Sequence, residues 1–253
     1  MANEISAPTA PSAADVPCTG EDITVAGLNA YLSRPREAST GGMLLLPSIT
    51  GISPQLREFA DGLAAAGVNA LSWDLWRGRP GSDDPAEMET QFQWASELDD
   101  ESSLTEMGKL LDHMFDELGC RQVGVIGWCI GGRFALLLGG SDSRLANVVA
   151  YHPTVPGSPA PNHTLDATEF TARIAGPAMI LYPGADEVVP VESFHRLQDA
   201  LNSRTTGPSI AHVYPGAGHG FTARALHGDP VNKAATDLSW PQVVAFIRAT
   251  TLV

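Results

Sequence analysis

The chain has 253 residues, a length that fits one large domain or two small ones. Hydrophobic residues make up 43% of the chain, which is enough for a sizeable core and excludes a disordered protein. Acidic residues (29) outnumber basic residues (15), and the resulting net charge of -14 repels phosphate backbones, so we expect no nucleic acid partner.

The chain opens with residues 1–17, which are rich in Ala, Pro and Ser and predict a flexible arm, whereas residues 18–253 are predicted to form one domain. In residues 22–34, apolar and polar side chains partly alternate, and Gly27 interrupts the pattern. This predicts an antiparallel pair of strands at a sheet edge. From there on, apolar strands alternate with helices. The predicted strands cover 43–47, 68–73, 122–127, 145–151, 177–181 and 209–214. The predicted helices cover 103–118, 131–138, 190–201 and 239–249, together with one that begins at 54 and stops at Gly67.

This alternation predicts an α/β fold, with a mostly parallel sheet covered by helices on both faces. Active sites of such sheets lie at the carboxyl ends of the strands, so the residues that directly follow each strand are the candidates for chemistry. Two irregular stretches, 77–101 and 153–165, also follow strands. They are interpreted either as ordinary surface loops or as a lid or rim over the site.

The strongest chemical signal is the run Gly-Trp-Cys-Ile-Gly-Gly at 127–132, between an apolar strand and a helix. It is the G-x-S-x-G pattern of a nucleophile elbow, with Cys129 in the place of serine. Such a turn holds the sulfur clear of the sheet at the amino end of a helix, where the partial positive charge favours the thiolate. The N–H of Ile130 is predicted to be one donor of an oxyanion hole, and the N–H of Ile49, after the strand 43–47, is expected to be the second.

Two further residues follow strands in the chain order nucleophile, acid, histidine, which is the order of α/β-hydrolases. Asp186 is preferred to the adjacent Glu187 as the acid because of its Gly-x-Asp spacing after the strand. His219 follows the last predicted strand and is the predicted base, with His152 as the competing histidine because it also directly follows a strand. The sequence therefore predicts a triad of Cys129, Asp186 and His219.

Nothing in the sequence indicates a metal or an organic cofactor. The three cysteines, Cys18, Cys120 and Cys129, are too few for a disulfide framework and are not spaced like a zinc site. The apolar runs are too short to span a bilayer, and the first residues lack the basic start and apolar segment of a signal peptide. We therefore expect a cytoplasmic protein that acts on a small molecule without a cofactor or a membrane, and a monomer as the default.

The sequence resembles the dienelactone hydrolase family, which has an α/β-hydrolase fold. The resemblance spans about residues 20–250, and the residues that carry it are the elbow at 127–132, Asp186, the run His219-Gly220-Phe221 and the turn Asp74-Leu75-Trp76. It implies an ester or lactone hydrolase in which Cys129 attacks the carbonyl carbon and forms an acyl-thiol intermediate. It also implies that His219, oriented by Asp186, moves the protons while N–H groups of Ile130 and Ile49 hold the oxyanion.

The sequence departs from this family at positions that would contact the substrate. The namesake carries a glutamate at or near the position of Ser48. It also has two arginines that grip the substrate carboxylate; this chain has Arg224 close to one of those positions and no basic residue at the other. Since serine cannot take a proton as a carboxylate does, activation of the thiol is expected to depend on His219 and the helix end. The weak arginine clamp predicts a neutral or apolar acyl group; the candidate substrate-binding residues are Ser48, Trp128, Tyr151, Phe221 and Arg224.

Two other functions stay open on the sequence. The missing glutamate and arginine also fit a catalytically silent binding protein with the same fold. A redox thiol pair of Cys120 and Cys129 is disfavoured, because the extended chain between them would separate the two by roughly 20–30 Å. The sequence does not give the substrate.

Overall fold

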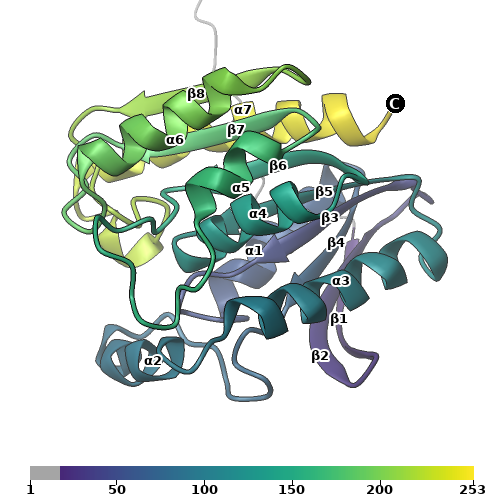
Figure 1. The fold of residues 1–253 in the computed structure, drawn as a ribbon. Helices are drawn as coiled ribbons and strands as arrows, with labels where there is room; N and C mark the ends of the chain where they lie inside the picture. Colours follow the sequence, from purple (N-terminus) through teal and green to yellow (C-terminus); the bar gives the residue numbers. More distant parts are fainter. Residues whose placement is uncertain (1–17) are drawn as a thin grey trace, which may run out of the picture.

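The sheet of this protein contains eight strands. The computed structural model describes residues 18–253, and the predicted arm at 1–17 lies outside the described residues. The strand order across the sheet is β1-β2-β4-β3-β5-β6-β7-β8 (Figure 1). The strands are β1 (Cys18–Val25), β2 (Leu28–Pro35), β3 (Gly41–Leu46), β4 (Asn69–Trp73), β5 (Gln122–Trp128), β6 (Leu145–Tyr151), β7 (Ala178–Pro183) and β8 (Ser209–Tyr214).

One edge of the sheet is antiparallel and the rest is parallel. β1 pairs antiparallel with β2, and β2 pairs antiparallel with β4. The hairpin turn places Ala26 and Gly27 at φ of 48° and 82°, the left-handed backbone that a tight two-residue hairpin turn needs. All other neighbours are parallel. The predicted edge pair and the predicted mostly parallel sheet are both confirmed.

Helices cover both faces of the sheet (Figure 1). Along β5, Val125 belongs to one hydrophobic core and the next residue, Ile126, belongs to the other. Because the central strands are buried on both faces, they form continuous apolar runs in the sequence. On one face lie α1 (Pro54–Ala65) and α7 (Pro230–Thr251), and on the other lie α3 (Asp100–Asp116), α4 (Ile130–Ser141), α5 (Ala167–Arg173) and α6 (Val191–Ser203).

The last helix begins earlier than the sequence pattern predicted. Asp229 caps it by accepting a hydrogen bond from the N–H of Val231, and Pro230 occupies its first turn. A helix from 239 would have placed Pro241 in the first turn, where proline is tolerated. The helix instead runs through Pro241, and its packing against the sheet outweighs the missing backbone hydrogen bond.

Two short helices were not predicted. α2 (Met88–Ala95) lies within the irregular stretch 77–101, and α5 follows the irregular stretch 153–165. They have eight and seven residues, too few for a hydrophobic period to be recognised. Tertiary contacts hold α2 in place: Gln91 is buried and donates a hydrogen bond from Nε2 to the carbonyl oxygen of Ser82 at 2.9 Å.

The two irregular stretches are fastened to each other. The side chain of Asn162 donates two hydrogen bonds from Nδ2, one to the carbonyl oxygen of Ala95 at 3.0 Å and one to that of Leu98 at 2.9 Å. This single amide joins the stretch 153–165 to the end of α2. This contact fixes the two stretches relative to each other.

A buried ion pair joins the same region to α4. Arg133 donates from Nη1 and Nη2 to the two carboxylate oxygens of Asp100 at 2.6 and 2.8 Å, and Nη2 also donates to the carbonyl oxygen of Leu165 at 2.9 Å. The N–H of Leu165 in turn donates to Asp100 at 2.9 Å. Burial opposes ionisation of Asp100, but these hydrogen bonds outweigh it and lower the pKa of the carboxyl.

Replacing Asp100 by asparagine is expected to lower the free energy of unfolding by about 3–5 kcal/mol, because it leaves the charge of Arg133 buried without a counterion. Urea unfolding measures this loss. The matched control is Lys233→Ala, which breaks the exposed pair of Lys233 with Asp237 on α7 and should change the same quantity by less than about 1 kcal/mol. Equal effects of the two substitutions would show that the buried pair has no special role.

Candidate active site

The turn between β5 and α4 holds Cys129 in a strained backbone conformation. Its φ of 55° and ψ of -116° are unusual for a residue with a side chain, and it occupies the N-cap position of α4. Glycines make the turn possible: a Cβ at Gly127 would lie 2.0 Å from the carbonyl oxygen of Gly131, and one at Gly131 would lie 2.1 Å from that of Leu46. Only glycine allows strand and helix to approach this closely around the sulfur.

The three predicted catalytic side chains meet at the carboxyl edge of the sheet. His219 Nε2 lies 3.2 Å from Cys129 Sγ, and His219 Nδ1 lies 2.9 Å from Asp186 Oδ2. The other oxygen of Asp186 accepts hydrogen bonds from the N–H groups of Val188 and Val189, at 2.8 and 2.9 Å. The carboxylate of Asp186 is therefore fixed on one side by backbone and orients the imidazole with the other.

Neither of the competing residues, Glu187 and His152, makes the contacts that Asp186 and His219 make with each other and with the sulfur. Glu187 is exposed to solvent. His152 is buried and its Nε2 lies 3.2 Å from the hydroxyl of Thr222, while its ring packs at 5.1 Å from the ring of His219. Burial and the charge of His219 keep the pKa of His152 well below its ordinary value. His152 is therefore neutral near pH 7 and supports the ring of His219 by packing.

The sulfur and the imidazole stabilise each other's charged forms. Burial alone would raise the pKa of Cys129, but the hydrogen bond and positive charge of His219, together with contacts from Thr154 and the N–H of Ile130, lower it. Burial alone would lower the pKa of His219, but hydrogen bonds with Asp186 and Cys129, and their negative charges, raise it to about 10. These contacts favour the thiolate–imidazolium form of the pair over the form in which both groups are neutral.

The two predicted oxyanion donors belong to different elements, Ile130 to the first turn of α4 and Ile49 to the loop after β3. Ile130 directly follows Cys129, and its N–H is close enough to the sulfur to favour the thiolate. Ile49 lies in the loop between β3 and α1, where its carbonyl oxygen accepts a hydrogen bond from Trp76 Nε1 at 3.0 Å. Ser48, at the position of the family glutamate, has its hydroxyl 2.9 Å from that of Thr50. The loop is thus held by a contact between its own hydroxyl groups and by a hydrogen bond from Trp76.

The structure corrects the expectation that Trp128, Tyr151 and Phe221 contact the substrate, because all three side chains are buried. Tyr151 and Phe221 are 0% exposed and Trp128 is 3% exposed, all within the core covered by α1 and α7. The hydroxyl of Tyr151 contacts Ser239 of α7 at 3.2 Å. A strand-end aromatic can point to either face of a sheet, and these point into the core, where they support the elbow rather than touch a ligand.

Arg224 also has a different setting from the one expected of a clamp. It lies on the surface and forms an ion pair with Glu58 of α1. In this structure its charge is therefore partly compensated by Glu58.

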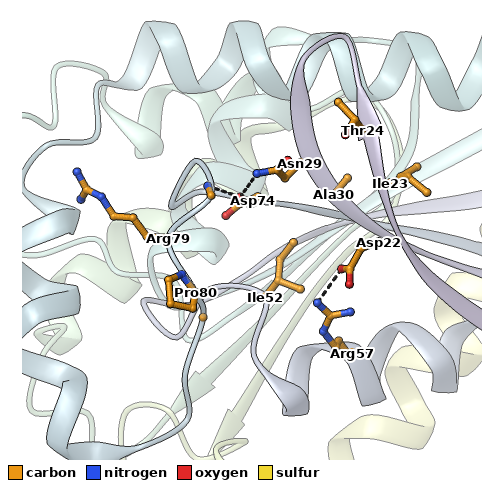
Figure 2. Close-up of a pocket in the computed structure, with 12 residues that line it drawn as sticks. Asp22, Ile23, Thr24, Asn29, Ala30, Ile52, Arg57, Asp74, Arg79 and Pro80 are labelled. Atoms are coloured by element: carbon orange, nitrogen blue, oxygen red, sulfur yellow. Dashed lines mark hydrogen bonds and ion pairs between the residues drawn. The ribbon is translucent and has the colours of Figure 1, made fainter.

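A hollow of about 410 Å³ lies beside the β1–β2 hairpin, and none of the three predicted catalytic residues lines it. Figure 2 shows Asp22, Arg57, Asn29 and Asp74 around it, with Arg57 turned toward Asp22 and Asn29 toward Asp74. Arg57 donates to Asp22 at 2.7 Å, and Arg79 on the opposite wall donates to Glu97 at 2.8 Å. Because these arginines are already paired, the hollow presents little free charge to a ligand.

Sequence reasoning missed Thr154. Its hydroxyl lies 3.1 Å from Cys129 Sγ. It follows β6 at the same edge of the sheet as the triad, so the strand-end rule could have drawn attention to it. No residue pattern, however, distinguishes a threonine that faces a sulfur from one that faces solvent.

Two features are absent from residues 18–253. No helix there is both long and apolar enough to cross a membrane. No three His, Cys, Asp or Glu side chains there are grouped so that they could hold a metal ion.

Comparisons with known proteins agree on one family. The sequence model described as "Dienelactone hydrolase family" matches residues 28–251. A carboxymethylenebutenolidase from Rhodococcus opacus is 28% identical over 221 residues, covering 86% of this chain and 85% of that protein. The solved structure of a proposed dienelactone hydrolase from Klebsiella pneumoniae superposes with a TM-score of 0.77 at 22% identity, covering 91% of this chain and 98% of the other. A dienelactone hydrolase-like promiscuous phosphotriesterase from metagenomic libraries gives a TM-score of 0.73 at 20% identity, with 92% and 98% covered.

Proposed function

This chain belongs to the dienelactone hydrolase family and is a hydrolase, and we propose that it cleaves a carboxylic ester or lactone through a Cys-His-Asp triad. The observation that carries the proposal is the continuous chain of contacts from sulfur to imidazole (3.2 Å) and from imidazole to carboxylate (2.9 Å). The strained backbone of Cys129 at the N-cap of α4 supports the same chemistry.

The first half of the reaction is acyl transfer to the sulfur. The thiolate of Cys129 attacks the carbonyl carbon, and the electron pair of the C=O bond moves to oxygen, where the N–H groups of Ile130 and Ile49 stabilise it. The tetrahedral intermediate collapses, the C–O bond to the leaving group breaks, and the imidazolium of His219 gives that oxygen its proton. An acyl-thiol enzyme and a neutral imidazole result.

The second half restores the enzyme. Neutral His219 takes a proton from water as the water oxygen attacks the thioester carbon. Collapse of this second intermediate breaks the C–S bond, so that the thiolate and the imidazolium are both regenerated and a carboxylic acid is released. Asp186 holds the ring in the tautomer that these transfers require and stabilises its positive charge.

The charges around the site support a neutral substrate. Arg224 is paired with Glu58, and the chain as a whole carries a net charge of -14. The overall negative charge of the chain would therefore disfavour the approach of a substrate carboxylate.

A panel of lactones and short aryl esters, matched in size and differing in charge, tests the proposed function. Neutral members are expected to have kcat/KM values at least about tenfold above those of carboxylate-bearing members, a factor that corresponds to ~1.4 kcal/mol. A clear preference for the carboxylate-bearing members would overturn the substrate class. Failure to turn over any member, together with an ordinary thiol pKa at Cys129, would favour the silent binding protein instead.

A further inference from the structure

The sulfur of Cys129 has a second polar neighbour besides the histidine. The hydroxyl oxygen of Thr154 lies 3.1 Å from Sγ, and His219 Nε2 lies 3.2 Å from it. Thr154 is half-buried at the start of the irregular stretch 153–165. No triad role accounts for a hydroxyl at this place.

The backbone is built to hold Thr154 there. The N–H of Cys129 donates to the carbonyl oxygen of Tyr151 at 3.1 Å, and the N–H of Thr154 donates to the carbonyl oxygen of Cys129 at 3.0 Å. Between these contacts, His152 has a φ of 34°, a strained value for a residue with a side chain. The strained bend turns the chain back across the elbow, which gives the hydroxyl a fixed position beside the sulfur.

The charge on the sulfur determines the direction of the hydrogen bond. A thiolate has no proton to donate, so it accepts from both neighbours: from the imidazolium N–H of His219 and from the hydroxyl of Thr154. Both contacts favour the ionised sulfur and so contribute to the lowered pKa of Cys129.

We propose that Thr154 is a catalytic residue, whose hydroxyl donates a hydrogen bond to the sulfur of Cys129 whenever that sulfur carries negative charge. This role rests on the proposed function of the site. It applies twice in each turnover: in the resting thiolate, and again when the C–S bond of the thioester breaks and the electron pair returns to sulfur. In the acyl-thiol form the sulfur is neutral and a poor acceptor, so the hydroxyl is released.

Alkylation of Cys129 by iodoacetamide across a range of pH tests the proposal, with modification read from the mass of the peptide that contains Cys129. Thr154→Val removes the hydroxyl but keeps the side-chain volume and the backbone N–H contact. The midpoint of alkylation is expected to rise by about one pH unit, the size expected for one hydrogen bond to a charged group. Thr154→Ser keeps a hydroxyl and should keep the low midpoint.

Two controls make the result specific. Thr105→Val removes an exposed hydroxyl on α3 and should leave the midpoint where it is in the unchanged protein. Thr154→Ala removes the same hydroxyl with a smaller side chain and should give the same shift in the midpoint. If one of the two variants folds poorly, the other still tests the role of the hydroxyl. Hydrolysis of the acyl enzyme, followed in single turnover, should slow in both variants.

The outcomes separate this role from the proposed function. An unshifted midpoint in Thr154→Val and Thr154→Ala, with a low midpoint and ester turnover in the unchanged protein, overturns the role of Thr154 alone. An ordinary thiol midpoint in the unchanged protein overturns the role together with the thiolate on which it rests. A purely structural role of Thr154 would lower stability or turnover without moving the midpoint.

Discussion

Replacing Cys129 by alanine is expected to lower the turnover of short aryl esters by at least roughly 10⁴-fold. The reason is that, among residues 18–253, Cys129 is the nucleophile whose side chain contacts His219 Nε2, at 3.2 Å. Initial rates with a chromogenic ester measure the loss. Cys129→Ser should retain a small part of the activity, because His219 can also take a proton from a hydroxyl.

Cys120 provides the matched control for this substitution. It is the other free cysteine whose burial the structure describes, and it is 4% exposed in the core, where burial raises the pKa of its thiol. Cys120→Ala should leave turnover per folded molecule unchanged. Unchanged turnover in Cys129→Ala, or an equal loss in Cys120→Ala, would exclude Cys129 as the nucleophile.

Replacing His219 by glutamine is expected to lower turnover by about 10³–10⁴-fold and to change the pH dependence of Cys129 alkylation. The imidazolium exists below the raised pKa of His219, about 10, and the thiolate exists above the lowered pKa of Cys129. The reactive pair therefore exists in the pH range between these two pKa values. Without the imidazolium, burial dominates and the pKa of the thiol returns to its ordinary value or above.

The effect on alkylation is largest on the acidic side. At pH 6.5 a thiol with an ordinary pKa near 8.5 is ionised to about 1%, so alkylation of Cys129 in His219→Gln should nearly cease there while the unchanged protein still reacts. His195→Gln, an exposed histidine on α6, is the control and should match the unchanged protein. An alkylation profile that is the same in all three proteins would contradict the ion pair.

The meeting of Cys129, His219 and Asp186 was within reach of sequence reasoning because each of them follows a strand. Parallel neighbours end at the same edge of a sheet, so residues that directly follow β5, β7 and β8 come near one another whatever the details of the loops. The glycines around Cys129 added a local requirement that few other turns share. Local pattern and sheet topology together were sufficient for this part of the site.

The sequence could not predict to which face of the sheet the side chains near the strand ends point. Tyr151 and Phe221 belong to segments near the site, yet both are packed in the core under α1 and α7. Which face a strand-end side chain takes depends on the helix that covers it. For Tyr151 that helix is α7, which begins much later in the chain, at Pro230, and contains Pro241, a residue that hides its length in the sequence pattern. The partnership of Asp100 with Arg133 is likewise set by packing between distant elements.

By itself, the sequence determined the alternation of strands and helices and the glycine-lined turn at Cys129, since both depend on residues that are neighbours in the chain. Only the tertiary structure decided that Arg224 is paired with Glu58, that three aromatic side chains are buried and that Thr154 faces the sulfur. Such contacts join segments whose relative placement depends on the packing of the whole sheet. No local pattern of residues records that packing.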